Sequence, residues 1–236
     1  ALIGLPLSAL AAPRDLLAIP HEVGHYVYRH GRTQQGLAPG SRFDAALKQR
    51  LTDLPDWCQA WLEEIFADVY GALVGGPVMA LGFAELVTDD PFADFTVDDG
   101  EHPVAALRPD IYHYVLEQQE THQLAVQQLR EDWTQRLQGR GAVTEFKPHG
   151  RDKPETLATA LAAVKQAMTA VLADLQALQK ETDTSLWSVP LTEDAAITAL
   201  LDAFSSQVKD LPVVDDELAP ELVVGALAAA RGMAAE

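Results

Sequence analysis

The sequence predicts a mainly α-helical protein, and three observations support this class. Hydrophobic residues recur with helical spacing along almost the whole chain. Segments suited to β-strands are few, and glycine and proline gather in short connecting regions. The composition is that of a globular chain, with 48% hydrophobic and 22% charged residues. At 236 residues the chain can form one substantial domain, or a core followed by a helical extension.

The helical periodicity falls into separate segments joined by loops. The expected helices cover 14–31, 43–52, 55–74, 77–88, 103–138, 154–181, 193–209 and 217–234. The expected loops cover 31–41, 89–103 and 139–154, and two short strands are expected at 92–97 and 142–146. The sequence therefore predicts helices with at most a small β element.

The segment 154–181 has the most regular pattern in the chain. Its apolar residues are spaced alternately four and three apart, which places them on one stripe of a helix. The stripe consists of Leu157, Leu161, Val164, Met168, Val171, Leu175 and Leu178. Pro154 suits the first turn of this helix, where a missing N–H loses no hydrogen bond. The stripe either binds a protein partner or packs as a bundle helix inside the same chain, and we favour the second interpretation.

Charge and cysteine content limit the possible functions. Thirty-five acidic residues against 17 basic ones give a net charge of −18, which argues against nucleic acid as a partner because phosphate binding needs clustered Lys and Arg. The single cysteine, Cys58, cannot form an intramolecular disulfide or a thiolate zinc site, and we expect it to be a packed core residue. Any metal site must therefore use histidine and carboxylate ligands.

The sequence gives no strong membrane or export signal. The longest apolar stretch, 69–84, is shorter than the ~20 residues that a membrane span needs, and Gly75, Gly76 and Pro77 interrupt it. The apolar residues at 1–13 lack a preceding basic segment. We therefore expect a cytoplasmic protein that is not inserted in a membrane.

Residues 21–25, with the sequence HEVGH, match the pattern H-E-x-x-H. On a helix, residues four apart lie on one face, so His21 and His25 can bind one metal ion. Glu22 then lies beside the metal, where a carboxylate can take a proton from an activated water. On this pattern we predict that His21 and His25 are ligands and that Glu22 is a catalytic base.

A second acidic element supplies the third ligand. Glu64 and Asp68 are four residues apart on an apolar helix and therefore share a face. A His₂Glu set leaves the fourth position of a zinc site for water, and Asp68 can bond the far nitrogen of a ligand histidine. Glu63 is the competing ligand, but it lies off the face of Asp68. The alternative is a solvated acidic face, which the apolar neighbours of these residues disfavour.

Three elements of the sequence resemble the M48 family of gluzincin zinc metallopeptidases, the group of the HtpX protease. HEVGHYVYRHG resembles the H-E-x-x-H helix of that family, EIFAD at 64–68 resembles its E-x-x-A-D element, and HPVAALR at 102–108 resembles its H-P-x-x-x-x-R element. The match covers about residues 15–112. The resemblance implies a zincin-like catalytic core at 1–115, followed by a helical region of unknown role at 116–236.

The chain also departs from the family. Relatives are often embedded in membranes and usually carry a sheet whose edge strand binds the peptide, and neither feature is found in this sequence. Pro109 follows Arg108, where an aliphatic residue is usual. Pro20 directly precedes His21, so the ligand helix either begins at Pro20 or bends just before the site.

The resemblance places His102 and Arg108 near the metal. There they would stabilise an oxyanion or bond a carboxylate behind the ligands, and the alternative is a loop histidine and a surface arginine. Tyr112 and His113 are further candidates for oxyanion donation. His30 lies on the opposite side of the helix from His21 and cannot bind the same metal.

These observations predict a zinc-dependent endopeptidase that hydrolyses peptide bonds of a protein or peptide substrate. The metal would be Zn²⁺ held by His21, His25 and Glu64, with Glu22 as the base. The alternative is a non-catalytic or partner-regulated helical scaffold that zinc stabilises, whose heptad helix at 154–181 binds another protein. An intact Glu22 argues for catalysis, because a structural site needs ligands but no base.

Overall fold

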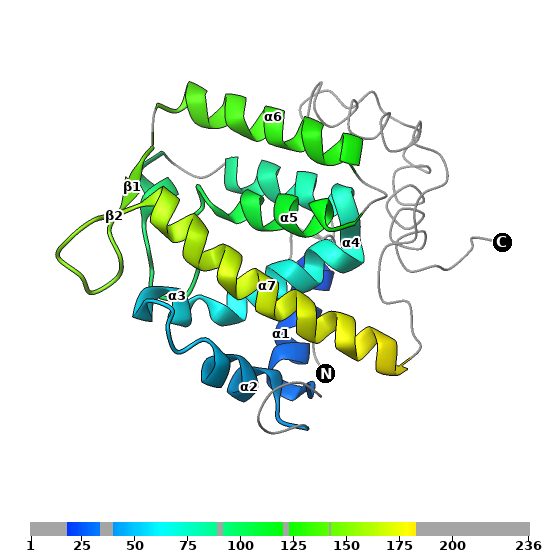
Figure 1. The fold of residues 1–236 in the computed structure, drawn as a ribbon. Helices are drawn as coiled ribbons and strands as arrows, with labels where there is room; N and C mark the ends of the chain where they lie inside the picture. Colours follow the sequence, from blue (N-terminus) through cyan, green and yellow to red (C-terminus); the bar gives the residue numbers. More distant parts are fainter. Residues whose placement is uncertain (1–17, 34–39, 89–91, 120–122, 142, 183–236) are drawn as a thin grey trace.

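A computed structural model of the chain describes residues 18–33, 40–88, 92–119, 123–141 and 143–182 (Figure 1). The expected helices at 193–209 and 217–234 lie outside the described residues. In chain order the elements are α1 (Ile19–His30), α2 (Phe43–Arg50), α3 (Asp56–Ala60), α4 (Leu62–Thr88), the 3-10 helix η3 (Phe92–Thr96), α5 (Arg108–Glu117), α6 (Gln123–Gly139), β1 (Glu145–Phe146), β2 (Glu155–Thr156) and α7 (Leu157–Thr182). The prediction of a mainly helical protein is confirmed.

Helix α4 is the centre of the fold, and α1, α2, α3, α5, α6 and α7 all contact it. Most of its side chains are buried, as its nearly continuous apolar sequence requires. Figure 1 shows α7 (yellow) running across α4 and α5, while α6 lies along the other side of α5. One hydrophobic cluster therefore includes residues from α1 to α7, and it joins the segments before and after residue 115.

A backbone kink divides α4 into two helical halves. Gly76 has φ 60° and ψ −152°, a conformation that glycine adopts without the steric clash of a Cβ atom. Pro77 follows directly, and its ring would otherwise clash with the preceding helical turn. The expected interruption between 55–74 and 77–88 is thus present as a bend.

The stripe of α7 packs inside the chain. Val164, Met168, Val171 and Leu175 are buried in the main cluster, and the other stripe residues pack against it. The helix begins at Leu157, so the placement of Pro154 in its first turn is wrong. Thr156 provides the start instead, because its Oγ1 accepts the N–H of Thr159 at 3.1 Å.

A buried ion pair fastens α7 to the N-terminal part of the fold. Asp174 is 1% exposed and accepts hydrogen bonds from Arg50 Nη1 at 2.8 Å and Arg50 Nη2 at 2.6 Å. The hydroxyl of Thr33 lies 3.3 Å from the same carboxylate. A carboxylate buried this deeply needs such partners, and the pair fixes α7 against α2.

The expected strand at 92–97 is wrong, because residues Phe92–Thr96 form the 3-10 helix η3. Only Val97 makes a β-bridge, parallel to Lys147. Phe95 is 1% exposed and stacks on Trp133, whereas Asp94 and Val97 are exposed. The Phe95 ring therefore anchors this segment to the core.

The expected helix at 103–138 is also wrong in its extent. It begins only at Arg108, where Pro109 occupies the first turn, and it ends at Glu117 before α6 starts at Gln123. The described residues that follow, Gln118 and Gln119, are polar and offer no apolar side chain to hold a continuing helix on the core. The expected strand at 142–146 is present only as β1, which pairs antiparallel with β2.

Within the described residues, β1 and β2 are the only strands, and each has two residues. The candidate ligands lie on α1 and α4, and the described part of the chain contains no extended sheet. By length and composition, α4 and α7 could each cross a membrane. However, 89% of the apolar window of α4 is buried inside the protein, as in a core helix.

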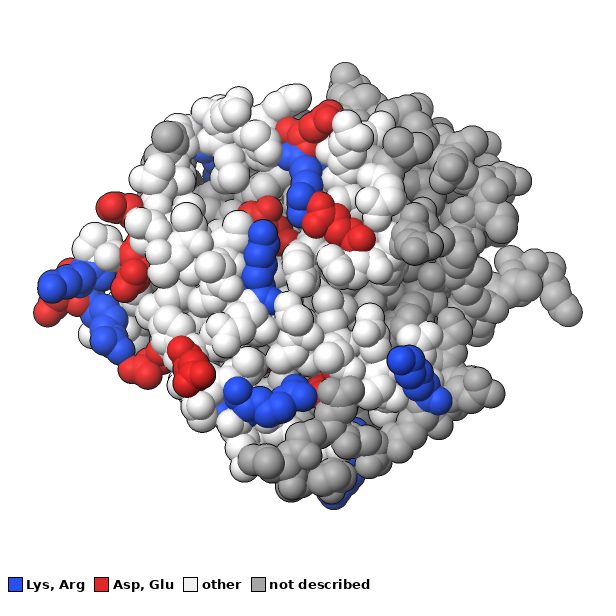
Figure 2. All heavy atoms as spheres, viewed as in Figure 1, with Lys and Arg blue, Asp and Glu red and all other residues white. Residues whose placement is uncertain are grey.

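Charged side chains are dispersed over the face of the molecule drawn in Figure 2. On this face the basic side chains stand singly or beside acidic ones, and they form no continuous band over the described residues. Nucleic-acid binding relies on clustered Lys and Arg, which this face does not present.

Candidate metal centre

The close approach of α1 and α4 positions the candidate ligands. A Cβ atom placed on Gly24 would lie 2.7 Å from the Cα of Ala67 and 3.1 Å from its carbonyl oxygen. Only glycine allows the backbones to meet this closely, because it has no Cβ. Gly24 lies between His21 and His25, so the contact brings both histidines against the turn of α4 that carries Glu64 and Asp68.

Helix α1, which carries the two histidines, begins at Ile19, two residues before His21. Pro20 is the second residue of α1, a position at which its missing N–H leaves no helical hydrogen bond unmade. Of the two possibilities for Pro20, the structure therefore shows a helix start rather than a bend.

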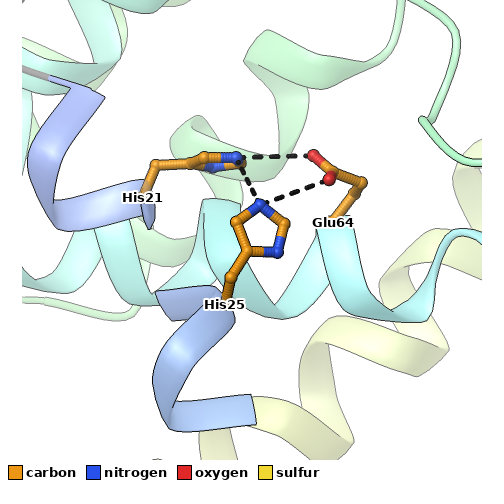
Figure 3. A group of neighbouring side chains, drawn as sticks. All are labelled: His21, His25 and Glu64. Carbon is orange, nitrogen blue, oxygen red and sulfur yellow. Dashed lines mark hydrogen bonds and ion pairs between the residues drawn. The ribbon is translucent and has the colours of Figure 1, made fainter. Parts of the chain in front are cut away.

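His21, His25 and Glu64 point toward one another across the α1–α4 contact (Figure 3). The two Nε2 atoms lie 3.1 Å apart. Glu64 places Oε2 3.4 Å from His21 Nε2 and Oε1 3.3 Å from His25 Nε2. All three side chains lie within reach of a single ion.

These distances fit a tetrahedral metal ion. With metal–ligand bonds of about 2.0–2.1 Å, two ligand atoms of a tetrahedron lie about 3.3–3.4 Å apart. The Nε2–Nε2 separation of 3.1 Å is close to such an edge, and each Nε2 lies 3.3 or 3.4 Å from one of the two Glu64 oxygens. Two imidazoles and one carboxylate are also a donor set that zinc accepts, and they leave one tetrahedral position for water or substrate.

Each ligand histidine has a carboxylate behind it, on its other ring nitrogen. His21 Nδ1 lies 2.9 Å from Asp68 Oδ1, an ion-pair distance without full hydrogen-bond geometry. His25 Nδ1 lies 3.1 Å from Glu63 Oε1, which also accepts from Arg29 Nε at 2.7 Å. These contacts favour the proton on Nδ1 and leave both Nε2 atoms to face the metal position.

The helical spacing predicts the contact of Asp68 with a candidate ligand histidine. It does not predict the contact of Glu63 with His25, because the sequence offers Glu63 only as a competing ligand. The structure instead places Glu63 against His25 and Arg29. Arg29 lies four residues after His25 and so shares its face of α1. Arg29 is 64% exposed, so its presence in the sequence did not require an acidic partner on α4.

Asp68 is the most buried charge of the site. Its side chain is 0% exposed, and it accepts from Arg108 Nε at 3.0 Å, Arg108 Nη2 at 2.8 Å and the Tyr112 hydroxyl at 2.9 Å. Burial alone would raise the pKa of Asp68, but Arg108 and His21 outweigh it and hold that pKa well below its usual range. Asp68 is therefore ionised and fully bonded.

Arg108 joins α5 to both acidic residues of the site. Besides its two bonds to Asp68, its Nη2 lies 3.3 Å from Glu64 Oε2, and its guanidinium lies 4.4 Å from the centre of the Phe83 ring. Of the two roles expected for Arg108, the structure therefore gives the contact with carboxylates behind the ligands. Tyr112 makes the same kind of contact, because its hydroxyl bonds Asp68 and its side chain is fully buried.

His102 stands on the open side of the centre. Its Nε2 lies 3.5 Å from Glu64 Oε1, its Nδ1 lies 2.7 Å from Asp99 Oδ2, and its side chain is 41% exposed. Asp99 also accepts the backbone N–H groups of Glu101 and His102, at 2.9 and 2.8 Å. The ring is thus held at the edge of the site, where an approaching substrate could reach it.

Asp98 fixes the loop that carries His102, and sequence reasoning missed it. It is 6% exposed and accepts the indole N–H of Trp61 at 3.0 Å, the N–H of Gly100 at 2.9 Å and the N–H of His149 at 2.8 Å. These bonds anchor the loop to the start of α4 and to the segment before β2. The run Asp98-Asp99-Gly100 marks a turn in the sequence, but it carries no sign of which acid is buried.

Glu22 follows His21 on α1 and is half-buried, so the predicted base lies next to the ligand set along the helix. His113 is 1% exposed and lies on the other side of α5, facing α6 and α7 instead of the metal centre. It is therefore not an oxyanion donor. His30 is exposed and packs on the Tyr26 ring.

Cys58 is fully buried in the main core, as expected. Burial raises the pKa of its thiol to about 12, so the thiolate that would act as a nucleophile is not formed at neutral pH.

The charge of the centre depends on His21. Burial lowers the pKa of this imidazole, but Asp68 and Glu64 outweigh that effect and raise the pKa to about 9. The pKa of Glu64 is lowered despite its burial, through His21 and Arg108. Without a metal, His21 is therefore protonated at neutral pH, and its extra proton occupies the nitrogen that a metal would use.

Comparison with family models, with curated proteins and with solved structures finds no match to this chain.

Proposed function

We propose that His21, His25 and Glu64 bind a zinc ion and that the protein hydrolyses peptide bonds at this centre. The observation that carries the proposal is the ligand geometry: the two Nε2 atoms lie 3.1 Å apart, each lies within 3.4 Å of one oxygen of Glu64, and each histidine has a carboxylate on its far nitrogen. Structural motifs of buried acids and histidines do not require this double arrangement, whereas zinc sites commonly have it.

Zinc at this position would supply Lewis acidity, which polarises a carbonyl group and lowers the pKa of a bound water toward ~7. The remaining chemistry belongs to side chains. Glu22 takes the proton of the attacking water and then passes it to the leaving amine. Asp68 and Glu63 hold the two imidazoles in the tautomer that leaves Nε2 free, and Arg108 holds Glu64 and Asp68 in register.

His102 is the side chain best placed to act on the substrate. Its Nδ1 is bonded to Asp99, so its Nε2 is directed toward the rim of the site beside Glu64. In its protonated form, with Nδ1–H bonded to Asp99, such a histidine donates from Nε2 to the oxyanion that develops on the scissile carbonyl. Arg108 and Tyr112 both bond Asp68, and in this proposal they support the ligands from behind.

The alternative of a non-catalytic scaffold has less support. The heptad stripe that would bind a partner packs on the chain's own core, and the site retains Glu22, which a structural zinc site does not need.

Metal analysis combined with a protein digestion assay tests the proposal. The purified chain should contain one zinc per molecule and cleave an unfolded substrate such as casein, and a chelator should abolish cleavage. Glu22→Gln should keep the zinc and lose the cleavage. Zinc bound without any cleavage by the wild-type chain would favour the scaffold.

A further inference from the structure

A second polar site lies on the opposite side of α5 from the metal centre. A cavity of about 170 Å³ lies between α5, α6 and α7. It is lined by Asp110, His113, Arg130, Trp133, Leu161 and Lys165, together with Thr134. None of these residues belongs to the metal centre, and none is used in the proposed hydrolysis.

Four buried polar atoms of this cavity lack hydrogen-bond partners among the described residues. These are both ring nitrogens of His113, the indole Nε1 of Trp133 and the Nε of Arg130. His113 is 1% exposed and Trp133 is 3% exposed, so bulk water does not reach them freely. A buried donor without a partner is destabilising, so several such groups in one cavity indicate a missing acceptor.

The donor types restrict what that acceptor can be. The indole N–H and the arginine Nε–H donate and cannot accept, so the occupant must present acceptor atoms. A metal cation is therefore excluded as the direct partner of these groups. Arg130 is already paired through Nη1 with Glu117 Oε1 at 2.5 Å, which leaves its Nε side for the cavity.

The charges of the lining favour a single negative charge on the occupant. Lys165 contributes a positive charge at the cavity, and Asp110 contributes a negative one, with its Oδ1 3.8 Å from His113 Nδ1. A dianion such as phosphate would be repelled by Asp110 more strongly than a monoanion. Leu161 and the Trp133 ring add apolar surface, which suits a short carbon skeleton.

We propose that this cavity is a binding site for a small monocarboxylate. Its two oxygens would accept from Trp133 Nε1 and Arg130 Nε, Lys165 would balance its charge, and its carbon atoms would lie on Leu161. The site is independent of the metal centre, because adjacent residues of α5 serve the two places: Tyr112 bonds Asp68, whereas His113 lines the cavity.

The test uses the indole N–H resonances of the full chain labelled with ¹⁵N, during titration with sodium propionate at constant ionic strength. The Trp133 resonance, assigned by its loss in Trp133→Phe, should move and saturate. The Trp61 resonance should stay in place, because its N–H is bonded to Asp98. Sodium chloride and inorganic phosphate, titrated separately, should produce no saturable shift of Trp133.

Two lysine variants separate binding from a general charge effect. Lys165→Met should weaken propionate binding about tenfold, the effect of losing one charged contact. Lys153→Met removes the same charge at an exposed position outside the cavity and should leave the affinity unchanged.

Three outcomes would overturn the proposal. Absence of a saturable shift would show that water alone fills the cavity. Saturation by phosphate but not by propionate would assign another class of ligand. Equal affinities of Lys165→Met and Lys153→Met would place any binding elsewhere.

Discussion

Gly24 of α1 lies directly against the backbone of Ala67 in α4, at a distance that leaves no room for a Cβ atom. The two ligand histidines flank this glycine, and the third ligand, Glu64, lies three residues before Ala67. The packing of two glycine- and alanine-bearing surfaces therefore sets the width of the metal centre. This relationship leads to the first prediction.

Gly24→Ala should destabilise the protein and weaken zinc binding together. The new methyl group would meet backbone atoms of Ala67 at 2.7 and 3.1 Å, so the helices must separate, at about 1–3 kcal/mol of unfolding free energy. Chemical denaturation and a zinc titration with a competing chelator measure the two effects. Gly139→Ala is the matched control, because no atom lies within 4 Å of its Cβ position and the change should not destabilise. Unchanged zinc affinity in Gly24→Ala would contradict the proposed role of this contact.

Glu22→Gln should reduce the rate of peptide hydrolysis about 10²–10⁴-fold, the usual contribution of a general base. Zinc content should remain at the wild-type level, because Glu22 is not among the three ligands. The measurements are cleavage of a fluorogenic peptide and metal analysis of the same preparation. A variant that retains full activity would show that another group takes the proton.

Glu63→Gln and Asp68→Asn should both weaken zinc binding, by about 10–100-fold, because each removes the carboxylate that orients a ligand histidine. Their effects on stability should differ. Asp68→Asn also removes the charge that Arg108 needs, and breaking a buried pair costs about 3–5 kcal/mol. Glu63 is more exposed, so its loss should change Tm little. Thermal unfolding of the two metal-free variants tests the contrast, which equal losses of Tm would contradict.

Zinc affinity should rise with pH up to about pH 9. In the metal-free protein the pKa of His21 is raised to about 9, so zinc must displace one proton below that pH. The same proton stabilises the metal-free fold: this contribution is complete below the ordinary pKa of 6.5 and is lost as pH rises through 9. The difference in Tm between zinc-loaded and metal-free protein should therefore increase across this window.

Calorimetry of zinc binding at pH 7, in buffers of different ionisation enthalpy, counts the released proton. Release of no proton from the wild-type chain would contradict the raised pKa of His21. His30→Asn, an exposed change on the same helix, should release as many protons as the wild type.

The parts of the centre that sequence predicted are those set by local helix geometry. The spacing of His21 and His25, and that of Glu64 and Asp68, follows from the helical turn alone. The contacts between α1 and α4 do not follow from the helical turn. His25 and Glu63 are 38 residues apart, and their contact depends on the rotation of one helix against the other. The pattern of residues within either helix does not determine how far one helix is rotated against the other.

The same distinction holds for the fold. The stripe of α7 was visible as a repeat, but the surface that covers it belongs to other helices. The burial of Asp98 likewise arises from Trp61, 37 residues away. Helix α5 ends at Glu117, before Gln118 and Gln119, without a proline or glycine to mark the position. A helix end of this kind depends on whether apolar side chains can pack on the core, and the local sequence does not determine that.

Asp68 is a residue of α4, and its carboxylate contacts His21 of α1 and both Arg108 and Tyr112 of α5. Three helices therefore meet at the atoms that orient a ligand. Selection for a different metal or a different reactivity could not adjust these atoms freely, because each change would also loosen the assembly of the helices. Sequence variation among descendants of this chain should therefore be concentrated on the open rim around His102, where a substitution would disturb the packing of the helices least.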